Sequence, residues 1–517
     1  MAYSNRAVIL ILVILFASIF FETYESRIQK SVRSELIENF KRLFAPTSEK
    51  SFTTWFGNVI TPQYIFRPNS LEDLQDIVKN AKTNGKKIRC AGRGHTWTSL
   101  SVTKDYLVIV NNLNKVVEIT NTDKNGWTVT VLSGTQIKTI EHALLQNNPP
   151  LAFESMTVPN FFSASGVIAV GAHGCKTGGP SISDLVVKLQ IVSEDGELQE
   201  FSNEKDPVEF SAAKLNLGLL GIIYSVTFRV EPLYNLRVND IVIPIKTWLN
   251  PASIKKTLDT SDSLDIIYWP FNKGKIDLSN DDIWIKQFVR TQETPTMSQL
   301  DLDHLLQLFY NISRHSFDLL LKTPNLTPIT KGFEWNDIVK ETLVTNQVLI
   351  ATDALHFLPD SELIVAEDST FVVKADPDFT NIATAFSFTI NKIGEYARKG
   401  KFPINISVAF RLLRASTALL SPAFDSDPNA VYSFFELTTY KNTPGWLDFQ
   451  TEVSQELMSK YGARPHWAKE WESVPGIKQY LHKALGDRIA TFEKVRAKYD
   501  PNNTFFDNDS LKQVFYG

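Results

Sequence analysis

The stretch AGRGHTWTS at residues 91–99 gathers glycine, hydroxyl and basic residues directly after a short segment, residues 87–90, that is expected to be a strand. A second stretch rich in small residues, SASGVIAVGAHG, occupies residues 163–174. A glycine-rich turn after a strand lets backbone N–H groups approach an anion closely, because no Cβ stands in the way. The two stretches together predict a site for a pyrophosphate, although each alone is equally compatible with a tight turn that binds nothing.

The sequence around these stretches predicts a domain of mixed helices and strands. Residues 70–73, Ser-Leu-Glu-Asp, resemble a capping box, and apolar residues at helical spacing continue to Ala81 before Gly85 ends the helix. Further strands are expected at residues 107–110, 127–132, 186–192, 197–201 and 222–230, and a further helix at residues 136–146. Neither glycine-rich stretch is a GxGxxG turn that opens a helix or a GxxxxGK[ST] loop, so the site is neither of the Rossmann nor of the P-loop type.

The composition is that of a globular protein with a large core. The 517 residues are 43% hydrophobic and 21% charged, and 53 basic against 57 acidic residues give a net charge of −4. A near-neutral chain lacks the clustered excess of cations that nucleic-acid binding requires, so no nucleic-acid partner is expected. Two cysteines, and eight histidines without an HExxH pair, predict neither a disulfide framework nor a metal site. The sequence identifies no protein partner.

The N-terminus differs from the rest of the chain. An uninterrupted apolar run at residues 7–21 lies between Arg6 and Glu22. The run has the length of a signal peptide, is shorter than the about 20 residues of a comfortable membrane span, and is followed by no clear cleavage site. We therefore expect an uncleaved signal anchor over residues 1–25 that holds the protein to the endoplasmic reticulum or secretory pathway; a cleaved peptide would give a secreted protein. An amphipathic connector follows at residues 26–57.

The order of the motifs resembles a known family. The helix after Pro68, the turn at residues 92–95, the loop at residues 166–174 and the glycines at residues 218–221 are together similar to the FAD-binding domain of the vanillyl-alcohol-oxidase type, also called the PCMH type. Any one of these motifs alone would be unspecific. Their occurrence in this order is what marks the resemblance.

The C-terminal sequence narrows the resemblance to one branch. RPHWAK at residues 464–469 and RAKYDPN at residues 496–502 resemble the closing motifs of the aldonolactone oxidoreductases, which include L-gulonolactone oxidase, arabinonolactone oxidase and galactonolactone dehydrogenase. The resemblance covers about residues 58–235 and 400–517, with weaker support between them.

The resemblance implies an α+β fold with three parts: a PCMH-type FAD-binding domain at residues 58–235, an α/β cap at residues 236–430, and a C-terminal segment at residues 431–517 that returns to the active site. It also implies bound FAD, with the 8α carbon of the flavin attached covalently to His95. The residues implied to contact FAD are Gly92, Arg93, Gly94, His95, Thr96, Ser165, Gly166, Gly171, His173, Gly174 and Ile223.

Residues 404–412 alternate strictly, which is typical of a strand with one buried face and one face toward a pocket. Arg411 lies on the second face. Members of the family that this chain resembles carry a Glu-x-Arg pair here, in which the glutamate holds the substrate hydroxyl and the arginine stabilises negative charge on the reduced flavin. Ala409 replaces that glutamate in this chain, so the usual carboxylate is missing. Glu436, in an expected strand at residues 431–440, is an alternative carboxylate.

His466 and Lys469 lie three residues apart and would share a face if their segment were helical. Lys469 would then stabilise the reduced flavin by its charge, and His466 would accept the hydroxyl proton as hydride leaves the substrate. With Arg411 they form the expected catalytic set. The chain is expected to oxidise a sugar-derived alcohol, with an aldono-1,4-lactone as the favoured substrate and dioxygen as the acceptor. The alternatives are another polyol or a sterol-like alcohol, or flavin binding at a membrane without turnover.

Overall fold

The computed structural model describes residues 49–517 with the exception of residues 178, 180, 299–318, 338 and 357–364. The expected anchor at residues 1–25 and the connector up to residue 48 lie outside the described residues. Among the residues that the structure does describe, no helix is both long enough and apolar enough to cross a lipid bilayer. All elements named below belong to the single unit that begins at Glu49.

A small parallel sheet carries the first glycine-rich turn. Its strands, in the order β3-β5-β4, are Tyr64–Phe66, Tyr106–Ile109 and Ile88–Ala91. Helix α3 (Leu71–Thr83) connects β3 to β4 and begins where the sequence predicts, because the Ser70 hydroxyl accepts a hydrogen bond of 3.1 Å from the backbone N–H of Asp73. Its apolar face, with Leu74 and Ile77, is buried as expected. The glycine-rich turn therefore leaves the sheet at the end of β4.

An antiparallel sheet of five strands comes next along the chain. In the order β10-β9-β11-β7-β6 its strands are Leu198–Ser202, Val186–Val192, Ile222–Arg229, Gly126–Leu132 and Val116–Thr122. The predicted helix at residues 136–146 is confirmed as α4 (Ile137–Leu145). The second glycine-rich stretch, where no helix was expected, begins with the short helix α5 (Ala164–Ala169). Ala164 and Ile168 are fully buried, so close packing against β11 stabilises a helix that the local sequence does not predict.

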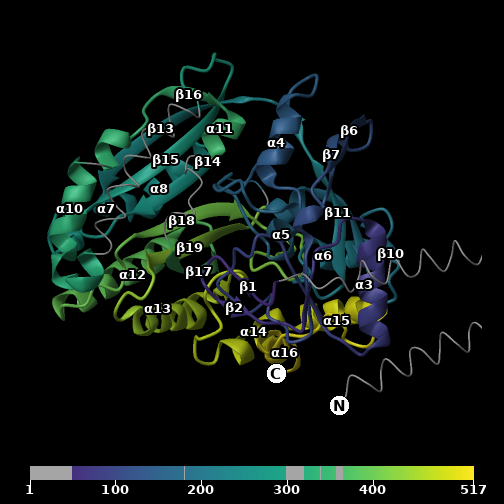
Figure 1. Cartoon of the computed structure of the whole chain (residues 1–517). Coiled ribbons are helices and arrows are strands. Elements are labelled where there is room, and N and C mark those ends of the chain that lie inside the picture. Colours follow the sequence, from purple (N-terminus) through teal and green to yellow (C-terminus); the bar gives the residue numbers. More distant parts are fainter. Residues whose placement is uncertain (1–48, 178, 180, 299–318, 338, 357–364) are drawn as a thin grey trace, which may run out of the picture. The chain divides into compact units, whose positions relative to one another are not determined.

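The cap is built on an antiparallel sheet of eight strands, of which β13 to β19 are drawn in teal and green in Figure 1. In order across the sheet the strands are β16 (Gln347–Ile350), β13 (Asn235–Pro244), β15 (Asp282–Thr291), β14 (Ser263–Tyr268), β18 (Ser407–Arg414), β19 (Val431–Tyr440), β17 (Ala366–Lys374) and β20 (Arg464–Pro465). Phe410 of β18 packs on Phe386 of helix α12 (Thr380–Arg398) with 4.8 Å between the ring centroids. The other face of β18, which carries Arg411, is thereby turned away from this helix.

The C-terminal segment returns to the FAD-binding half. The backbone N–H of Ile88 donates to the Thr504 carbonyl at 2.8 Å, and that of Trp97 donates to the Ala468 carbonyl at 3.0 Å. The expected α+β fold is thus confirmed. The remaining elements are β1 (Phe52–Thr53), β2 (Val59–Ile60), β8 (Leu151–Ala152), α6 (Pro207–Lys214), β12 (Glu231–Pro232), α7 (Ile245–Trp248), α8 (Pro251–Asp259), α10 (Thr327–Asp337), α11 (Ala351–Leu355), α13 (Trp446–Tyr461), α14 (Ile477–Leu485), α15 (Asp487–Tyr499) and α16 (Asp509–Tyr516).

Arg89 of β4 joins three segments that are distant in the sequence. Its buried guanidinium donates to the carbonyl oxygens of Leu100 at 2.6 Å, Leu217 at 2.8 Å and Phe505 at 2.8 Å. A planar fork of donors can satisfy several loop carbonyls that have no partner in a strand ladder. Burial lowers the pKa of Arg89 to about 10, so the side chain is still charged at neutral pH.

We expect Arg89→Met to destabilise the protein by about 3–5 kcal/mol, because three buried carbonyl oxygens lose a charged donor. A lower midpoint of urea-induced unfolding at pH 7 would show the effect. Arg67→Met is the matched control, since Arg67 pairs with the partly exposed Glu49, and surface pairs contribute about 0–1 kcal/mol. Equal losses of stability in the two variants would contradict the role assigned to Arg89.

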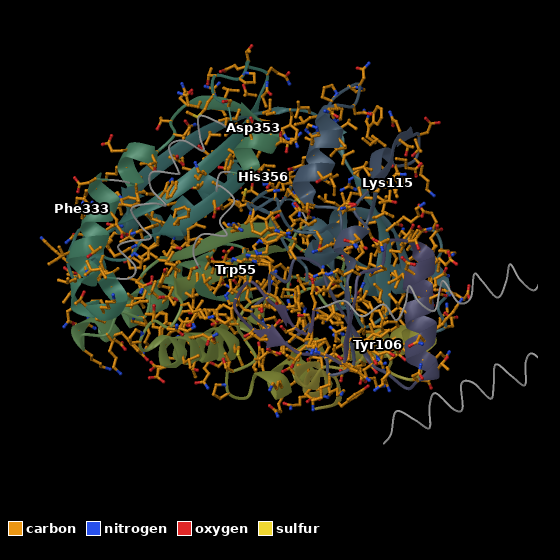
Figure 2. All side chains as sticks on the ribbon, viewed as in Figure 1. Trp55, Tyr106, Lys115, Phe333, Asp353 and His356 are labelled. Atoms are coloured by element: carbon orange, nitrogen blue, oxygen red, sulfur yellow. The ribbon has the colours of Figure 1, made fainter. Side chains whose placement is uncertain are left out.

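His356 connects the cap to the FAD-binding half. It follows α11 and is labelled in Figure 2. Its Nδ1 lies 2.8 Å from the carbonyl oxygen of Val158, and its Nε2 lies 2.7 Å from Oε1 of Glu141 in α4. Both partners are acceptors, so both ring nitrogens must donate and the imidazole carries a positive charge. Burial alone would lower the pKa of His356, but the carboxylate of Glu141 raises it above its ordinary value.

A raised pKa in the folded state makes this contact depend on pH. Its stabilisation is complete below about pH 6.5, the ordinary pKa of histidine, and is lost as the pH rises through the raised pKa. We expect wild type to be more stable than His356→Gln by about 1–3 kcal/mol near pH 6, and the difference to shrink toward about pH 9. Thermal unfolding at several pH values measures it, with His142→Gln, at an exposed position of α4, as the control. A difference that does not change with pH would contradict the charged state.

Candidate active site

A cavity of about 510 Å³ lies between the glycine-rich stretches and the cap sheet. Strands β14, β18, β19 and β17 contribute one part of its wall, and the C-terminal segment contributes another. All but two of the predicted site residues line this cavity: Gly92, Arg93, Gly94, His95, Thr96, Ser165, Gly166, His173, Ile223, Arg411, His466 and Lys469. Residues from the two ends of the chain therefore meet around one space.

The two glycine-rich stretches abut at Gly92. A Cβ at this position would lie 2.1 Å from Oγ of Ser163, so a larger residue would require at least the Ser163 side chain to move. Gly94, with φ of +70°, adopts the left-handed conformation that glycine tolerates best. Because both stretches also open to the same cavity, their backbone N–H groups can serve a single pyrophosphate.

Gly171 and Gly174 are the two predicted residues that do not line the cavity. The carbonyl oxygen of Gly171 lies 3.2 Å from Nε2 of His466. A Cβ on Gly174 would lie 2.5 Å from the carbonyl oxygen of Met156, so this glycine lets two loops approach each other. Their contact with FAD stays a prediction.

His95 stands at the cavity within a group of aromatic rings. It stacks on Trp55, labelled in Figure 2, with 4.2 Å between the ring centroids, and contacts the ring of Phe162 at 4.8 Å. Burial, with the charge of Lys469 adding to it, lowers the pKa of His95 to about 3. The imidazole is therefore neutral at physiological pH and keeps a ring nitrogen with a free lone pair.

Arg411 of β18 lines the part of the cavity that the cap sheet contributes. Its Nε and Nη2 lie 3.3 and 3.1 Å from the two carboxylate oxygens of Asp265 in β14, and its Nη1 lies 3.3 Å from Oε1 of Glu436 in β19. Burial alone would lower the pKa of Arg411, but the charges of Asp265 and Glu436 raise it above its ordinary value. The arginine is thus a permanent cation with a fixed orientation.

Lys469 supplies a second cation. It forms an ion pair with Asp368 of β17, and its Nζ lies 4.2 Å from the centroid of the Trp97 ring. The segment from His466 to Lys469 is a turn rather than the helix considered above: the N–H of Lys469 donates to the His466 carbonyl at 3.1 Å. Pairing of β20 with β17 places this turn at the cavity.

His466 is held by the backbone on both sides of its ring. Its Nε2 lies 3.2 Å from the carbonyl oxygen of Gly171, and its Nδ1 accepts a hydrogen bond of 3.2 Å from the N–H of Ala468. Burial lowers the pKa of His466 well below its ordinary value, so the ring is neutral with its proton on Nε2. In this arrangement neither ring nitrogen is free for a substrate proton, and the predicted role of His466 as a base stays untested.

Sequence reasoning did not select Asp265, Asp368 or Trp55. Asp265 is the one charged residue of β14, and a lone charge in a largely apolar strand is the signal that could have found it. Asp368 stands beside Glu367 and Ser369 in β17, where no sequence signal singles it out. Their partners lie more than 100 residues away in the sequence. Trp55 precedes the first glycine-rich stretch in a segment without a recognisable pattern.

The residues present fit FAD. Two abutting glycine-rich turns can take its diphosphate, a neutral His95 lies beside them, and the cations Arg411 and Lys469 line the same cavity. Fold and site together define the class of protein, a flavoprotein oxidoreductase.

Comparisons with known proteins define the family more closely. Residues 62–202 match the FAD binding domain family, and residues 381–514 match the D-arabinono-1,4-lactone oxidase family. The D-arabinono-1,4-lactone oxidase of Yarrowia lipolytica is 34% identical over 88% of this chain and 95% of its own length. The L-gulonolactone oxidase of Mus musculus is 22% identical over 88% of this chain and 96% of its own length. The chain belongs to the aldonolactone oxidase family.

Solved structures agree on the fold. The crystal structure of cholesterol oxidase from B. sterolicum superposes with a TM-score of 0.76 over 90% of this chain and 96% of that chain. The two sequences are only 19% identical, so this likeness concerns the fold and not the substrate.

Proposed function

We propose that the protein oxidises a hydroxyl group of an aldono-1,4-lactone, with FAD as cofactor and dioxygen as acceptor, and so forms hydrogen peroxide. The observation that carries the proposal is that Arg411 and Lys469 line the same cavity as the two glycine-rich stretches and His95. The lactone oxidases to which this chain is similar support a lactone as substrate.

The roles of the residues follow from their charge and position. FAD, when bound, supplies the acceptor for the hydride of the alcohol carbon. The backbone N–H groups of residues 92–96 and 165–166 hold its diphosphate. Arg411 and Lys469 stabilise the negative charge that the reaction places in the cavity, because charges among buried protein groups interact more strongly than in bulk solvent.

We also propose that FAD is attached covalently, through a bond between a ring nitrogen of His95 and the 8α carbon of the flavin. The new bond replaces one C–H bond of the 8α methyl group and the N–H bond of the imidazole; both hydrogens leave as protons, and the two electrons pass to the flavin ring and from there to dioxygen, the proposed acceptor. A neutral imidazole is the nucleophilic form, and the low pKa of His95 keeps it in that form. The stacking on Trp55 holds the ring in one orientation. Covalent attachment would prevent loss of the cofactor.

A substrate screen tests the function. Purified protein is mixed without oxygen with D-arabinono-1,4-lactone, L-gulono-1,4-lactone, an alditol and an apolar secondary alcohol, and bleaching of the yellow flavin is followed. We expect the lactones to bleach it, and peroxide to form when air is admitted. Bleaching only by the apolar alcohol would favour the second candidate, which Ala409 and the cavity-lining Trp269 and Trp284 support. No bleaching by any of them would indicate binding without turnover.

We propose that residues 7–21 anchor the protein to a membrane of the endoplasmic reticulum or secretory pathway. The length and apolar character of this run support the proposal. Deletion of residues 1–25 should turn a protein that sediments with membranes into one that stays in the supernatant and is still yellow. Sedimentation of the shortened protein with membranes would contradict the anchor.

A further inference from the structure

The cap sheet contains a carboxylate directly opposite the position where the family glutamate is missing. In the antiparallel pairing of β18 with β19, the Cα partner of Ala409 is Glu436. We infer that Glu436 replaces the missing glutamate and accepts a hydrogen bond from the hydroxyl group of the substrate. This inference rests on the proposed function, because it names the residue that positions the substrate of that same site.

The register of the sheet places both residues on the cavity side. Directly opposed residues of an antiparallel pair point to the same face, with about 4.5–5.5 Å between their Cβ atoms. Ala409 and Glu436 accordingly both line the cavity, as does Arg411 two residues further along β18. A glutamate side chain that starts from β19 can therefore reach the space that a glutamate at position 409 would occupy, and the small side chain of Ala409 leaves that space open.

Arg411 does not depend on Glu436 for its orientation. Asp265 already engages Nε and Nη2 of the guanidinium as a two-pronged partner, and Asp265 is almost fully buried. Glu436 reaches only Nη1, at 3.3 Å, in an ion pair without the alignment of a hydrogen bond. The second carboxylate is thus available for another partner.

Oε1 of Glu436 lies in the ion pair with Arg411 but has room for a further, well-aligned donor. Among the described residues, none donates a hydrogen bond to its buried Oε1. Nε2 of His173 lies 4.0 Å from this oxygen, and because Nδ1 of His173 lies 3.2 Å from the carbonyl oxygen of Gly174, Nδ1 carries the proton of the neutral ring and Nε2 carries a lone pair. Two acceptors therefore face each other across the cavity wall. A substrate hydroxyl placed here can donate its single proton to Oε1 of Glu436, which adds a hydrogen bond to the ion pair that this oxygen forms with Arg411.

A double-mutant cycle between the two strands tests the inference. We expect Glu436→Ala to slow anaerobic reduction of the flavin by the lactone by roughly 10- to 100-fold, since a hydrogen bond to a charged acceptor is lost. Ala409→Glu should also slow it, because it sets two like charges directly opposite each other. The double variant Glu436→Ala with Ala409→Glu moves the carboxylate to the neighbouring strand, and its rate should return to within about tenfold of wild type.

Equilibrium binding provides a readout apart from turnover. Calorimetry with the chemically reduced protein under argon measures the affinity for the lactone without reaction. Glu436→Ala should weaken this affinity at least about tenfold, and should leave unchanged the affinity for an analogue in which hydrogen replaces the reacting hydroxyl. Glu436→Gln, which preserves the shape of the side chain, shows whether charge is required. Glu367→Gln is the matched control, because Glu367 lies on β17 outside the cavity and accepts from the N–H of Asn442.

The outcomes distinguish a failure of the proposed lactone oxidation from a failure of the role of Glu436. If no lactone bleaches the wild-type flavin, the proposed function fails. If lactones do bleach it and the losses in the cycle simply add, or if the analogue loses as much affinity as the lactone, the function stands and the role of Glu436 is wrong. Recovery in the double variant, together with a loss of affinity confined to the hydroxyl-bearing ligand, would establish Glu436 as the substrate-positioning carboxylate.

Discussion

His95→Ala should convert an acid-stable flavin into one that trichloroacetic acid releases completely. The imidazole is the only part of residue 95 that can bond to the flavin, so its removal leaves FAD held by the backbone cradle and by packing alone. The variant should still be yellow when purified gently, because the glycine-rich stretches that hold the diphosphate are unchanged. Its flavin should be found in the supernatant after precipitation, whereas the flavin of wild type should stay with the pellet.

Two comparisons make this result decisive. His142→Ala removes an exposed histidine of α4 and should leave the flavin in the pellet. Mass spectrometry of a peptide that contains residue 95 should show the added mass of FAD in wild type and none in His95→Ala. Release of the flavin from acid-treated wild type would show that the covalent bond does not exist, and would leave the rest of the site unaffected.

Arg411→Met should slow reduction of the flavin by the lactone by about 10²- to 10³-fold. The loss of one preorganised group that stabilises developing charge has effects of this size. The pair of Arg411 with Asp265 is buried, so the variant also leaves a carboxylate without its partner. The double variant Arg411→Met with Asp265→Asn no longer has an unpaired buried carboxylate. It should regain stability without regaining the rate of flavin reduction.

The strand itself provides the control for this prediction. Arg414→Met changes an exposed arginine three residues along β18, where the side chain lies on the other face, and should alter the rate little. Arg411→Lys keeps the charge but loses the two-pronged contact, and should fall between wild type and Arg411→Met. Rapid-mixing measurements of flavin absorbance give the rates. Equal rates in Arg411→Met and wild type would remove Arg411 from the reaction.

Local sequence predicted the elements whose causes are local. The helix after Ser70 begins where its cap is, and the strand at residues 186–192 has the predicted bounds. The alternation at residues 407–411 assigns the correct faces of β18, because neighbouring side chains of a strand must point to opposite sides. These features can be predicted from the segment alone, without the rest of the chain.

The local sequence did not predict the conformation of two segments, one made of small residues and one that forms a turn. Helix α5 lies in a stretch of small residues, and the closing turn at residues 466–469 follows a strand of only two residues. In both segments tertiary packing decides the conformation, since weak local preferences are easily overridden.

The sequence by itself determined the class of site: two glycine-rich stretches, a histidine within the first of them, and cations in the C-terminal part of the chain, in the order of an FAD-binding family. Only the tertiary structure decided which charges meet. Asp265, Arg411 and Glu436 come together because β18 pairs with β19, the next strand of the chain, and also with β14, whose Asp265 lies 146 residues before Arg411. A slip of one residue would turn Glu436 to the opposite face, and no local pattern encodes that register, because it is set by the burial of the whole sheet.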